Sequence, residues 1–192
     1  PIDTDLFAYH PKAPHHRRKL LSIRPYASRI YANDLTVQAI LALQEQPWFE
    51  ELEVRLVGTG PLFEETVAPL RHLDNVILDQ RFLTHAEISR LHQDYGVFLC
   101  PTRMDTQGVS RDEAMASGLV PVTTRVAAVP EFVDESCAFM AAPEDISALA
   151  AGIAQFQRDP ELFDAMSKAA ADRVRRQAAK NQTIPLELDL FT

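Results

Sequence analysis

Residues 97–123 read VFLCPTRMDTQGVSRDEAMASGLVPVT, and this stretch decides the fold. The uninterrupted apolar run at 97–100 predicts a short buried strand. A polar loop follows, and residues 110–117 have the pattern of a helix that Gly118 ends in a left-handed conformation. A second apolar run at 120–123 predicts another strand. A strand, a helix and a strand in close succession indicate two parallel strands joined by a helical crossover.

The same alternation extends in both directions along the chain. Short apolar runs predict further strands at 20–23, 54–57, 76–78 and, less strongly, 138–140. Helix start signals stand between these runs: Asp34 as an N-cap, Pro61 as a first helical residue after Gly58-Thr59-Gly60, a capping box of Thr84 and Glu87, and the segments 143–145 and 159–161. Uniformly apolar strands separated by helices predict a Rossmann-like, doubly wound α/β fold, with a parallel sheet of about six strands and helices on both faces.

Composition limits the classes of function. The chain has 192 residues, of which 46% are hydrophobic, and its 27 acidic and 19 basic side chains give a net charge of -8. An acidic protein matches a phosphate backbone poorly, so we expect no nucleic-acid partner. Two cysteines, Cys100 and Cys137, suit a reducing compartment and predict a cytoplasmic location. No apolar run approaches the ~18 residues that a spanning helix requires.

We expect three parts along the chain. Residues 1–18 are predicted to be a leading segment that enters from a missing N-terminal domain. Residues 19–180 form the predicted Rossmann-like domain, and residues 181–192, which include Pro185, form a C-terminal tail. Because the chain begins at Pro1 in what reads as a loop, we expect it to be a piece of a longer protein.

Ligands of such sheets bind beyond the carboxyl ends of the strands, which selects the loops at 24–33, 58–61, 79–83 and 101–110. Gly58 and Gly60 either let a backbone approach a ligand or only form a tight turn. Gly108 precedes a helix whose free N–H groups attract anions. Arg24 and Arg29 could complete a diphosphate cradle, although each alone is more often a solvated charge.

The segment 101–131 carries a family resemblance. Asp105 and Glu113 lie eight positions apart, and Glu113 is followed by Ala-Met-Ala-Ser-Gly-Leu-Val-Pro-Val. This pattern resembles the C-terminal, donor-binding domain of retaining GT-B glycosyltransferases of the glycosyl transferases group 1 type, a family that includes sucrose synthases and many polysaccharide transferases. The resemblance extends over nearly the whole chain, through motifs at 1–7, 57–62 and 74–76 that occur in the family's order.

The resemblance implies roles for particular residues. Glu113 would hold the ribose hydroxyls of the donor, whereas Asp105 and the backbone amides of Gly108 and Val109 would contact the donor sugar. These two carboxylates are the expected catalytic pair. The remaining expected donor-binding residues are Arg24 and Arg29 at the diphosphate, Arg81 and Phe82 near the base, and Gly58 and Gly60 in the turn.

The resemblance also implies a reaction. A sugar would move with retention from a nucleotide diphosphate sugar to a glycan or lipid-linked acceptor, with no obligatory metal or other cofactor, because the arginines and the helix N-terminus would neutralise the leaving group. The acceptor would bind through the missing N-terminal domain, so the chain alone would be inactive. The whole protein could associate peripherally with the inner membrane face.

The sequence departs from the family pattern in three ways. Asp105 replaces the usual glutamate and is one methylene shorter. Arg29 stands where a lysine is usual, and the two cations bind phosphate differently. Two glycines of the pattern are absent: Ile23 stands before Arg24, and the run Asp79-Gln80-Arg81-Phe82 follows the third strand.

Other interpretations stay open. The histidines at 10, 15, 16, 85 and 92 lack partners at metal-site spacing, which favours packing or solvated roles. Cys100 reads as core, and Arg173, Arg175 and Arg176 could touch an anionic membrane but more commonly form a solvated face. Two other functions remain: a nucleotide-sugar epimerase of the same architecture, and a non-catalytic nucleotide-sugar-binding or interaction domain. Detection of epimers and calorimetry with nucleotide sugars would separate them.

Overall fold

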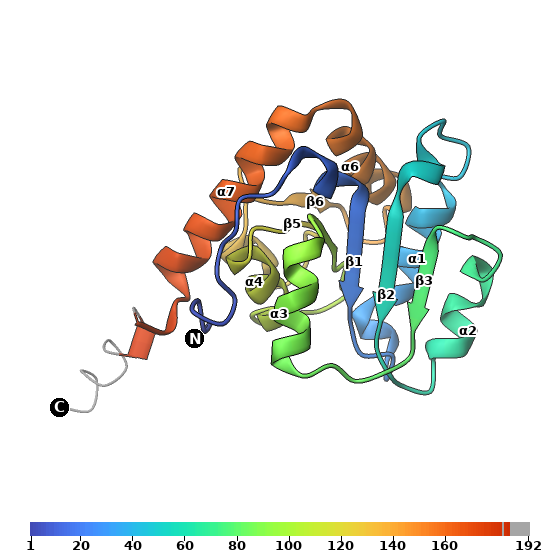
Figure 1. Ribbon diagram of the computed structural model, residues 1–192. Coiled ribbons are helices and arrows are strands. Elements are labelled where there is room, and N and C mark those ends of the chain that lie inside the picture. The colour runs from blue at the N-terminus through green and yellow to red at the C-terminus, as the bar shows by residue number, and fades with distance from the viewer. Residues whose placement is uncertain (182, 185–192) are drawn as a thin grey trace.

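The protein forms one parallel six-stranded sheet. The computed structural model describes residues 1–181, 183 and 184 (Figure 1). The strand order is β3-β2-β1-β4-β5-β6, and every neighbouring pair runs parallel. The strands are β1 (Lys19–Ile23), β2 (Glu53–Val57), β3 (Val76–Asp79), β4 (Val97–Leu99), β5 (Val120–Thr124) and β6 (Phe139–Ala141). This order is that of dinucleotide-binding folds and confirms the predicted Rossmann-like class.

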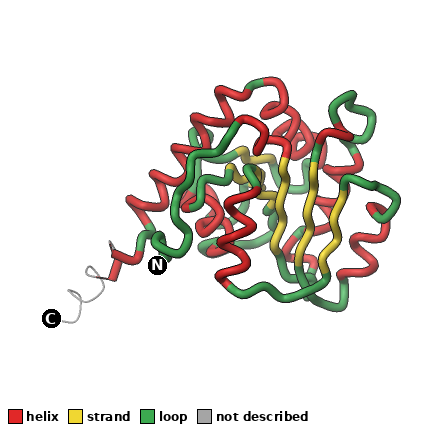
Figure 2. The backbone as a smooth tube through the Cα atoms, in the orientation of Figure 1, coloured by secondary structure: helices red, strands yellow, loops and turns green. Residues whose placement is uncertain are grey.

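Helices cover both faces of the sheet (Figure 2). They are α1 (Asn33–Leu41), α2 (Phe63–Val67), α3 (His85–Asp94), α4 (Val109–Ala116), α5 (Val129–Phe132), α6 (Ile146–Arg158) and α7 (Pro160–Gln177), with short 3-10 turns η1 (Pro14–Arg18), η2 (Arg29–Tyr31), η3 (Phe49–Glu51) and η4 (Ala68–Leu70).

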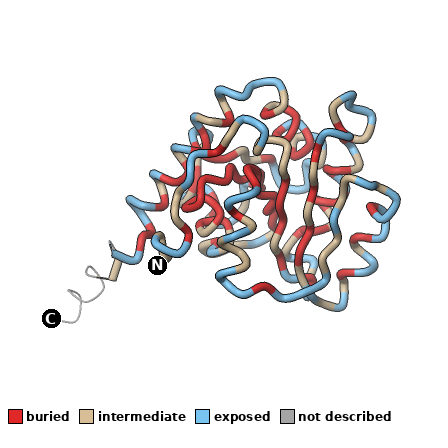
Figure 3. The backbone as a smooth tube through the Cα atoms, viewed as in Figure 1, coloured by how far each residue is buried: buried red, intermediate tan, exposed pale blue. Residues whose placement is uncertain are grey.

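Burial on both faces explains why the strands are apolar at successive positions. Leu20 packs in a core with α1, α2 and α6, whereas its neighbour Leu21 packs on the opposite face with α3 and α4. Both side chains are fully buried. The central strands β4 and β5 are buried at every position, whereas the edge strand β3 has no buried residue (Figure 3).

Several local predictions are confirmed. Thr84 and Glu87 form the predicted capping box of α3. Gly118 has a φ of 87° and ends α4 in the left-handed conformation. Asp145 caps α6 by accepting a hydrogen bond from the Ala148 N–H, and the Asp159 side chain caps α7 in the same way.

Two predicted helix starts are wrong. Asp34 is not the N-cap of α1, because the capping position falls on Ala32 in a left-handed conformation and the Asp34 carboxylate instead binds Arg103. Pro61 does not open α2, which begins at Phe63, because the turn at Gly60 continues through Leu62.

The first residues pack against the end of α7. Ile2 pairs with Ala179, and both Ile2 and Phe7 are buried. The leading segment 1–18 therefore contributes to the core. The predicted boundaries at 18 and 180 stay predictions, and residues 182 and 185–192 of the predicted tail lie outside the described residues.

Candidate functional site

Two cavities meet at the carboxyl end of β1. The larger has a volume of about 540 Å³ and lies toward β2, β3 and α3. The smaller, of about 480 Å³, lies toward the loop between β4 and α4. Ile23, Arg24 and Pro25 line both, so the two cavities adjoin there and form one cleft. A cleft at this edge of the sheet is where ligands of the fold bind.

Arg24 is a buried cation where the two cavities adjoin. It is only 7% exposed, and its guanidinium stacks on the Tyr31 ring at 5.3 Å. Its Nη1 donates to the Ser110 hydroxyl on the first turn of α4 at 3.3 Å, and its Nε has no partner among the described residues. A buried guanidinium beside the N-terminus of α4 gives this point a positive potential suited to an anion.

The β4–α4 loop forms the wall of the smaller cavity. Asp105, Gly108 and Val109 line it, as the sequence predicts for a shared site with Arg24. Gly108 is the N-cap of α4 and has a φ of 78°. A Cβ at this position would lie 2.9 Å from the Arg111 guanidinium, which is the end of a flexible side chain, so the preference for glycine comes from the backbone conformation.

The sequence analysis missed an ion pair that lies beneath this loop. Arg111 and Asp112 are 2% and 3% exposed, and the Arg111 guanidinium donates to Asp112 Oδ1 at 2.8 and 3.0 Å and to the Gln107 carbonyl. Burial raises the pKa of Asp112 to about 6, and its Oδ2 has no partner among the described residues. Adjacent charges on a helix usually face solvent. The available signal was their spacing, since both lie one turn before the apolar Met115 and Ala116.

Glu113 lies on α4 and lines neither cavity. Its side chain is 13% exposed, and its Oε1 is 4.0 Å from Nε2 of His85. Burial raises the pKa of this carboxyl. His85 lines the larger cavity, a position that the sequence analysis did not assign to it. Of the two predicted catalytic carboxylates, Asp105 therefore lines the smaller cavity, whereas Glu113 is linked to the larger one only through its approach to His85.

The far wall of the larger cavity carries the predicted base-binding residues. Arg81 and Phe82 both line it. Phe82 is 83% exposed, whereas the Arg81 guanidinium is bound by Asp79 at 3.0 Å and by Glu87 at 2.7 Å. Phe82 thus presents a free apolar ring at the rim, and Arg81 is held by its own neighbours.

The two glycines after β2 make room for the backbone that carries Arg24. A Cβ on Gly58 would lie 1.9 Å from the Arg24 carbonyl oxygen, and one on Gly60 would lie 2.3 Å from the Tyr26 carbonyl carbon. Gly58 also lines the larger cavity, whereas Gly60 lines neither cavity. The tight-turn interpretation therefore accounts for Gly60, and both interpretations hold for Gly58.

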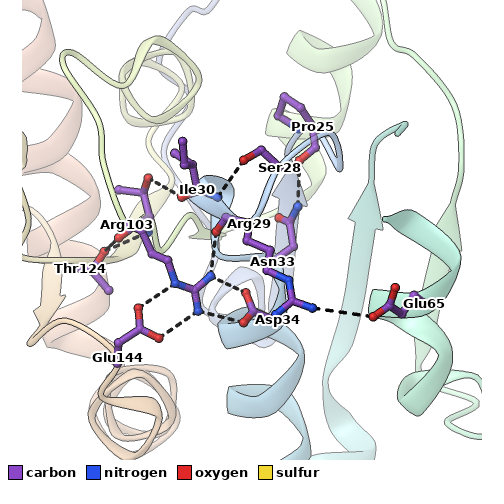
Figure 4. Close-up of polar contacts among 11 residues, drawn as sticks. Pro25, Ser28, Arg29, Ile30, Asn33, Asp34, Glu65, Arg103, Thr124 and Glu144 are labelled. Carbon is purple, nitrogen blue, oxygen red and sulfur yellow. Dashed lines mark hydrogen bonds and ion pairs between the residues drawn. The ribbon is translucent and has the colours of Figure 1, made fainter. Parts of the chain in front are cut away.

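Arg29 lies apart from the cleft, contrary to the expectation that it shares a cradle with Arg24. Its side chain is 78% exposed, and its guanidinium lies 3.9 Å from Glu65, at a separate groove of about 290 Å³ next to α1 and α2 (Figure 4). The reason is local: Arg29 opens the turn η2, where its backbone carbonyl is bound by Arg103 and its side chain turns toward Glu65.

Four further expectations concern a metal site, a membrane-spanning helix, the cysteines and the basic residues near the end of α7. Among the described residues, no three His, Cys, Asp or Glu side chains lie close enough to hold a metal ion, and none of the described helices could span a bilayer. Cys100 and Cys137 are both buried and free. Of the basic residues near the end of α7, Arg173 donates to the Phe132 carbonyl and pairs with Asp134, and Arg175 pairs with Asp172.

Relatives in sequence are glycosyltransferases by name. The chain is 32% identical over 130 residues to the colanic acid biosynthesis glycosyltransferase WcaL of Salmonella typhimurium, covering 62% of this chain. It is 25% identical over 130 residues to the sulfoquinovosyl transferase SQD2 of Arabidopsis thaliana, covering 66% of this chain. These matches cover only 32% and 25% of the two relatives' own lengths.

Solved structures share the fold. The C-terminal domain of the glycosyl transferase group 1 family protein LpcC from Francisella tularensis superposes with a TM-score of 0.78 at 17% identity, covering 94% of this chain and 100% of that domain. Sucrose-phosphate synthase from Thermosynechococcus elongatus gives a TM-score of 0.78 at 20% identity, covering 99% of this chain and 51% of that one. The family model described as glycosyl transferases group 1 matches residues 17–159. The chain belongs to the glycosyl transferases group 1 family.

Proposed function

We propose that this chain is the donor-binding half of a glycosyltransferase that uses a nucleotide diphosphate sugar. The observation that carries the proposal is the two-part cleft, in which a buried cation, Arg24, lines both cavities and contacts the first turn of α4. A nucleotide sugar has the same order of parts: a nucleoside, a doubly negative diphosphate and a sugar. Each cavity falls within the range of ~300–1,000 Å³ typical of small-molecule sites.

The two cavities suggest how the donor lies. The nucleoside would occupy the larger cavity, with its base against the exposed Phe82 and its ribose hydroxyls near Glu113. The diphosphate would lie at Arg24 and the amides of Gly108 and Val109, where the α4 N-terminus adds to the positive potential. The sugar would then reach Asp105 in the smaller cavity. Charge developing on the leaving diphosphate would be stabilised by groups already in place.

The finer features of the reaction belong to the same proposal. We propose that transfer retains the anomeric configuration, that it requires no metal, and that the acceptor is a glycan or lipid-linked sugar bound by a preceding domain. On this view the 192 residues bind nucleotide but do not turn over alone. Two buried thiols suit work in the reducing cytoplasm, and we propose peripheral attachment of the whole protein to the inner membrane face.

Calorimetry on the 192-residue chain tests the donor site. UDP, GDP, UDP-glucose and GDP-mannose serve as probes, and at least one diphosphate and its sugar should bind. Glu113→Gln should weaken both forms of that nucleotide by roughly ten- to hundred-fold, as expected for a lost charge-assisted hydrogen bond. Glu161→Gln, at an exposed position on the first turn of α7, is the matched control and should change neither affinity.

Asp105→Asn separates the sugar end of the site from the nucleotide end. It should leave UDP or GDP binding unchanged and weaken only the corresponding nucleotide sugar. Equal weakening of both would contradict this division of the cleft. Absence of binding by all four probes would instead favour a pure interaction domain, and epimer formation without transfer by the full-length protein would favour an epimerase.

A further inference from the structure

We propose that Arg103 is a positioning residue that sets the direction of Asp105 toward the donor sugar. The inference rests on the proposed function only for the identity of what Asp105 contacts. Arg103 lies two residues before Asp105 at the start of the β4–α4 loop, and it lines neither cavity of the cleft. Its role would therefore be to hold the loop and not to touch the ligand.

The guanidinium of Arg103 binds groups of the η2 turn, the first turn of α1 and the β6–α6 loop (Figure 4). It binds the Asp34 carboxylate at 2.8 Å through two nitrogens and the Glu144 carboxylate at 2.8 and 2.9 Å. It also donates to the Arg29 carbonyl at 2.7 Å. These contacts use all five N–H groups of the side chain, which a lysine could not reproduce.

Backbone contacts extend this junction to the residues beside Asp105. The Arg103 N–H donates to the Ile30 carbonyl at 2.9 Å. The Thr102 hydroxyl lies 3.2 Å from the Ile30 carbonyl oxygen and 2.8 Å from the Met104 carbonyl oxygen. The chain leading to Asp105 is thus fixed to the η2 turn at 102 and 103.

Two of the joined segments contain a non-glycine residue in the left-handed region. Glu144 has a φ of 59°, and Ala32, two residues before Asp34, has a φ of 48°. Such conformations are unfavourable for residues with a Cβ and persist where surrounding contacts hold them. Glu144 is itself a partner of Arg103, and Ala32 lies two residues before the other partner, Asp34. The ion pairs with Arg103 therefore help to hold both residues in these unfavourable backbone conformations.

In the part of the chain that the structure describes, the Asp105 carboxylate is not held in place by hydrogen bonds of its own. Among the described residues no hydrogen bond is formed by its carboxylate, and only its backbone carbonyl is engaged, by the Ala128 N–H at 3.4 Å. Its direction therefore follows from the backbone of the loop. Because Arg103 fixes that backbone two residues earlier, loss of the junction should displace Asp105 without removing any ligand-contacting atom.

Methyl NMR tests the displacement without any ligand. The chain has four methionines: Met104 is exposed and adjoins Asp105, whereas Met115 and Met166 are buried in the core. In Arg103→Ala and Arg103→Lys, the ¹³C-methyl signal of Met104 should shift and change its relaxation, while those of Met115 and Met166 stay in place. Arg125→Ala, which breaks an exposed pair with Glu135, is the control and should leave Met104 unchanged. An unaltered Met104 signal in Arg103→Ala would overturn the proposal.

A double-mutant cycle tests the functional consequence. Arg103→Ala should weaken the nucleotide sugar that binds best by about tenfold and its free diphosphate less than twofold, as Asp105→Asn does. In the Asp105→Asn background, Arg103→Ala should add nothing, because both act through the same carboxylate. Additive losses, or a Met104 shift with no change in sugar affinity, would overturn the positioning role. Failure of the wild type to bind any nucleotide would refute the proposed function and leave the methyl test intact.

Discussion

One arginine holds each end of the β4–α4 loop, and the two arginines differ in how deeply they are buried. Arg103 at the first end has a side chain 28% exposed and satisfies two carboxylates and a carbonyl. Arg111 at the other end has a side chain 3% exposed and shares one carboxylate, Asp112, whose second oxygen has no partner among the described residues. Both arginines form hydrogen bonds that hold the loop containing Asp105 and Gly108.

The comparison shows how burial changes the energetic role of a charge. Near the surface, ion pairs lose little hydration when they form and contribute little net stability. In the interior the cost of removing two charges from water is large, and removal of one partner leaves the other charge uncompensated. We therefore expect the buried anchor to dominate stability and the exposed anchor to affect mainly the position of the loop.

The largest effect should follow from breaking the buried pair. Arg111→Met should lower the free energy of unfolding by about 3–5 kcal/mol, because Asp112 would remain buried and unpaired. Equilibrium unfolding in urea at pH 7 measures the change. The double variant Arg111→Met with Asp112→Leu should recover most of the loss, since it removes both charges. A double variant as unstable as the single one would show that the ion pair itself stabilises the protein, and that the loss does not come from an unpaired buried Asp112.

The pH dependence of stability should reveal the same carboxyl. Burial raises the Asp112 pKa from 3.8 to about 6, so the folded protein binds this proton more tightly than the unfolded chain. The resulting stability is fully present below about pH 4 and is lost as the pH rises through 6, by about 3 kcal/mol.

Asp112→Asn isolates this contribution. His92 acts in the opposite direction, because burial lowers its pKa to about 3 and its contribution is lost as the pH falls below 6.5. Since the variant keeps His92, the difference in unfolding free energy between wild type and variant should change between pH 4 and 6.5 through Asp112 alone. A difference that is constant over this range would contradict the raised pKa.

Breaking the exposed anchor should have a smaller effect on stability. Arg103→Ala should cost about 1–2 kcal/mol, the size expected for a partly exposed network of charge-assisted hydrogen bonds. The loss should shrink in 1 M salt, which screens exposed charges. Thermal and urea unfolding at low and high salt measure both quantities. A loss equal to that of Arg111→Met would remove the distinction between the two anchors.

The strands and the cleft could be predicted from the sequence, whereas the contacts of these two arginines were not predicted. Strand identity was predictable because runs such as 97–100 are apolar at every position, and only a sheet buried on both faces requires that. The placement of Arg24, Asp105 and Gly108 followed from the rule for strand ends. Contacts between distant segments leave no local pattern, so Asp34 could not be identified from the sequence as a partner of Arg103. The inward direction of Arg111 did have a signal, its spacing from the apolar Met115, and this signal went unused.

Substitution of Arg29 should have the smallest effect on both stability and ligand binding. Its side chain is 78% exposed, and it faces Glu65 at 3.9 Å, so Arg29→Ala should change the free energy of unfolding by less than about 0.5 kcal/mol. Its position outside the cleft also predicts a weak effect on ligands. Arg24→Ala should weaken the diphosphate that binds by about tenfold or more, because a buried cation loses a charge-assisted contact, whereas Arg29→Ala should weaken it less than threefold. Calorimetry with UDP and GDP at low salt compares the two variants directly. Equal losses would mean that Arg29 leaves Glu65 and turns into the cleft when the ligand binds, which would restore the cradle that the sequence resemblance implies.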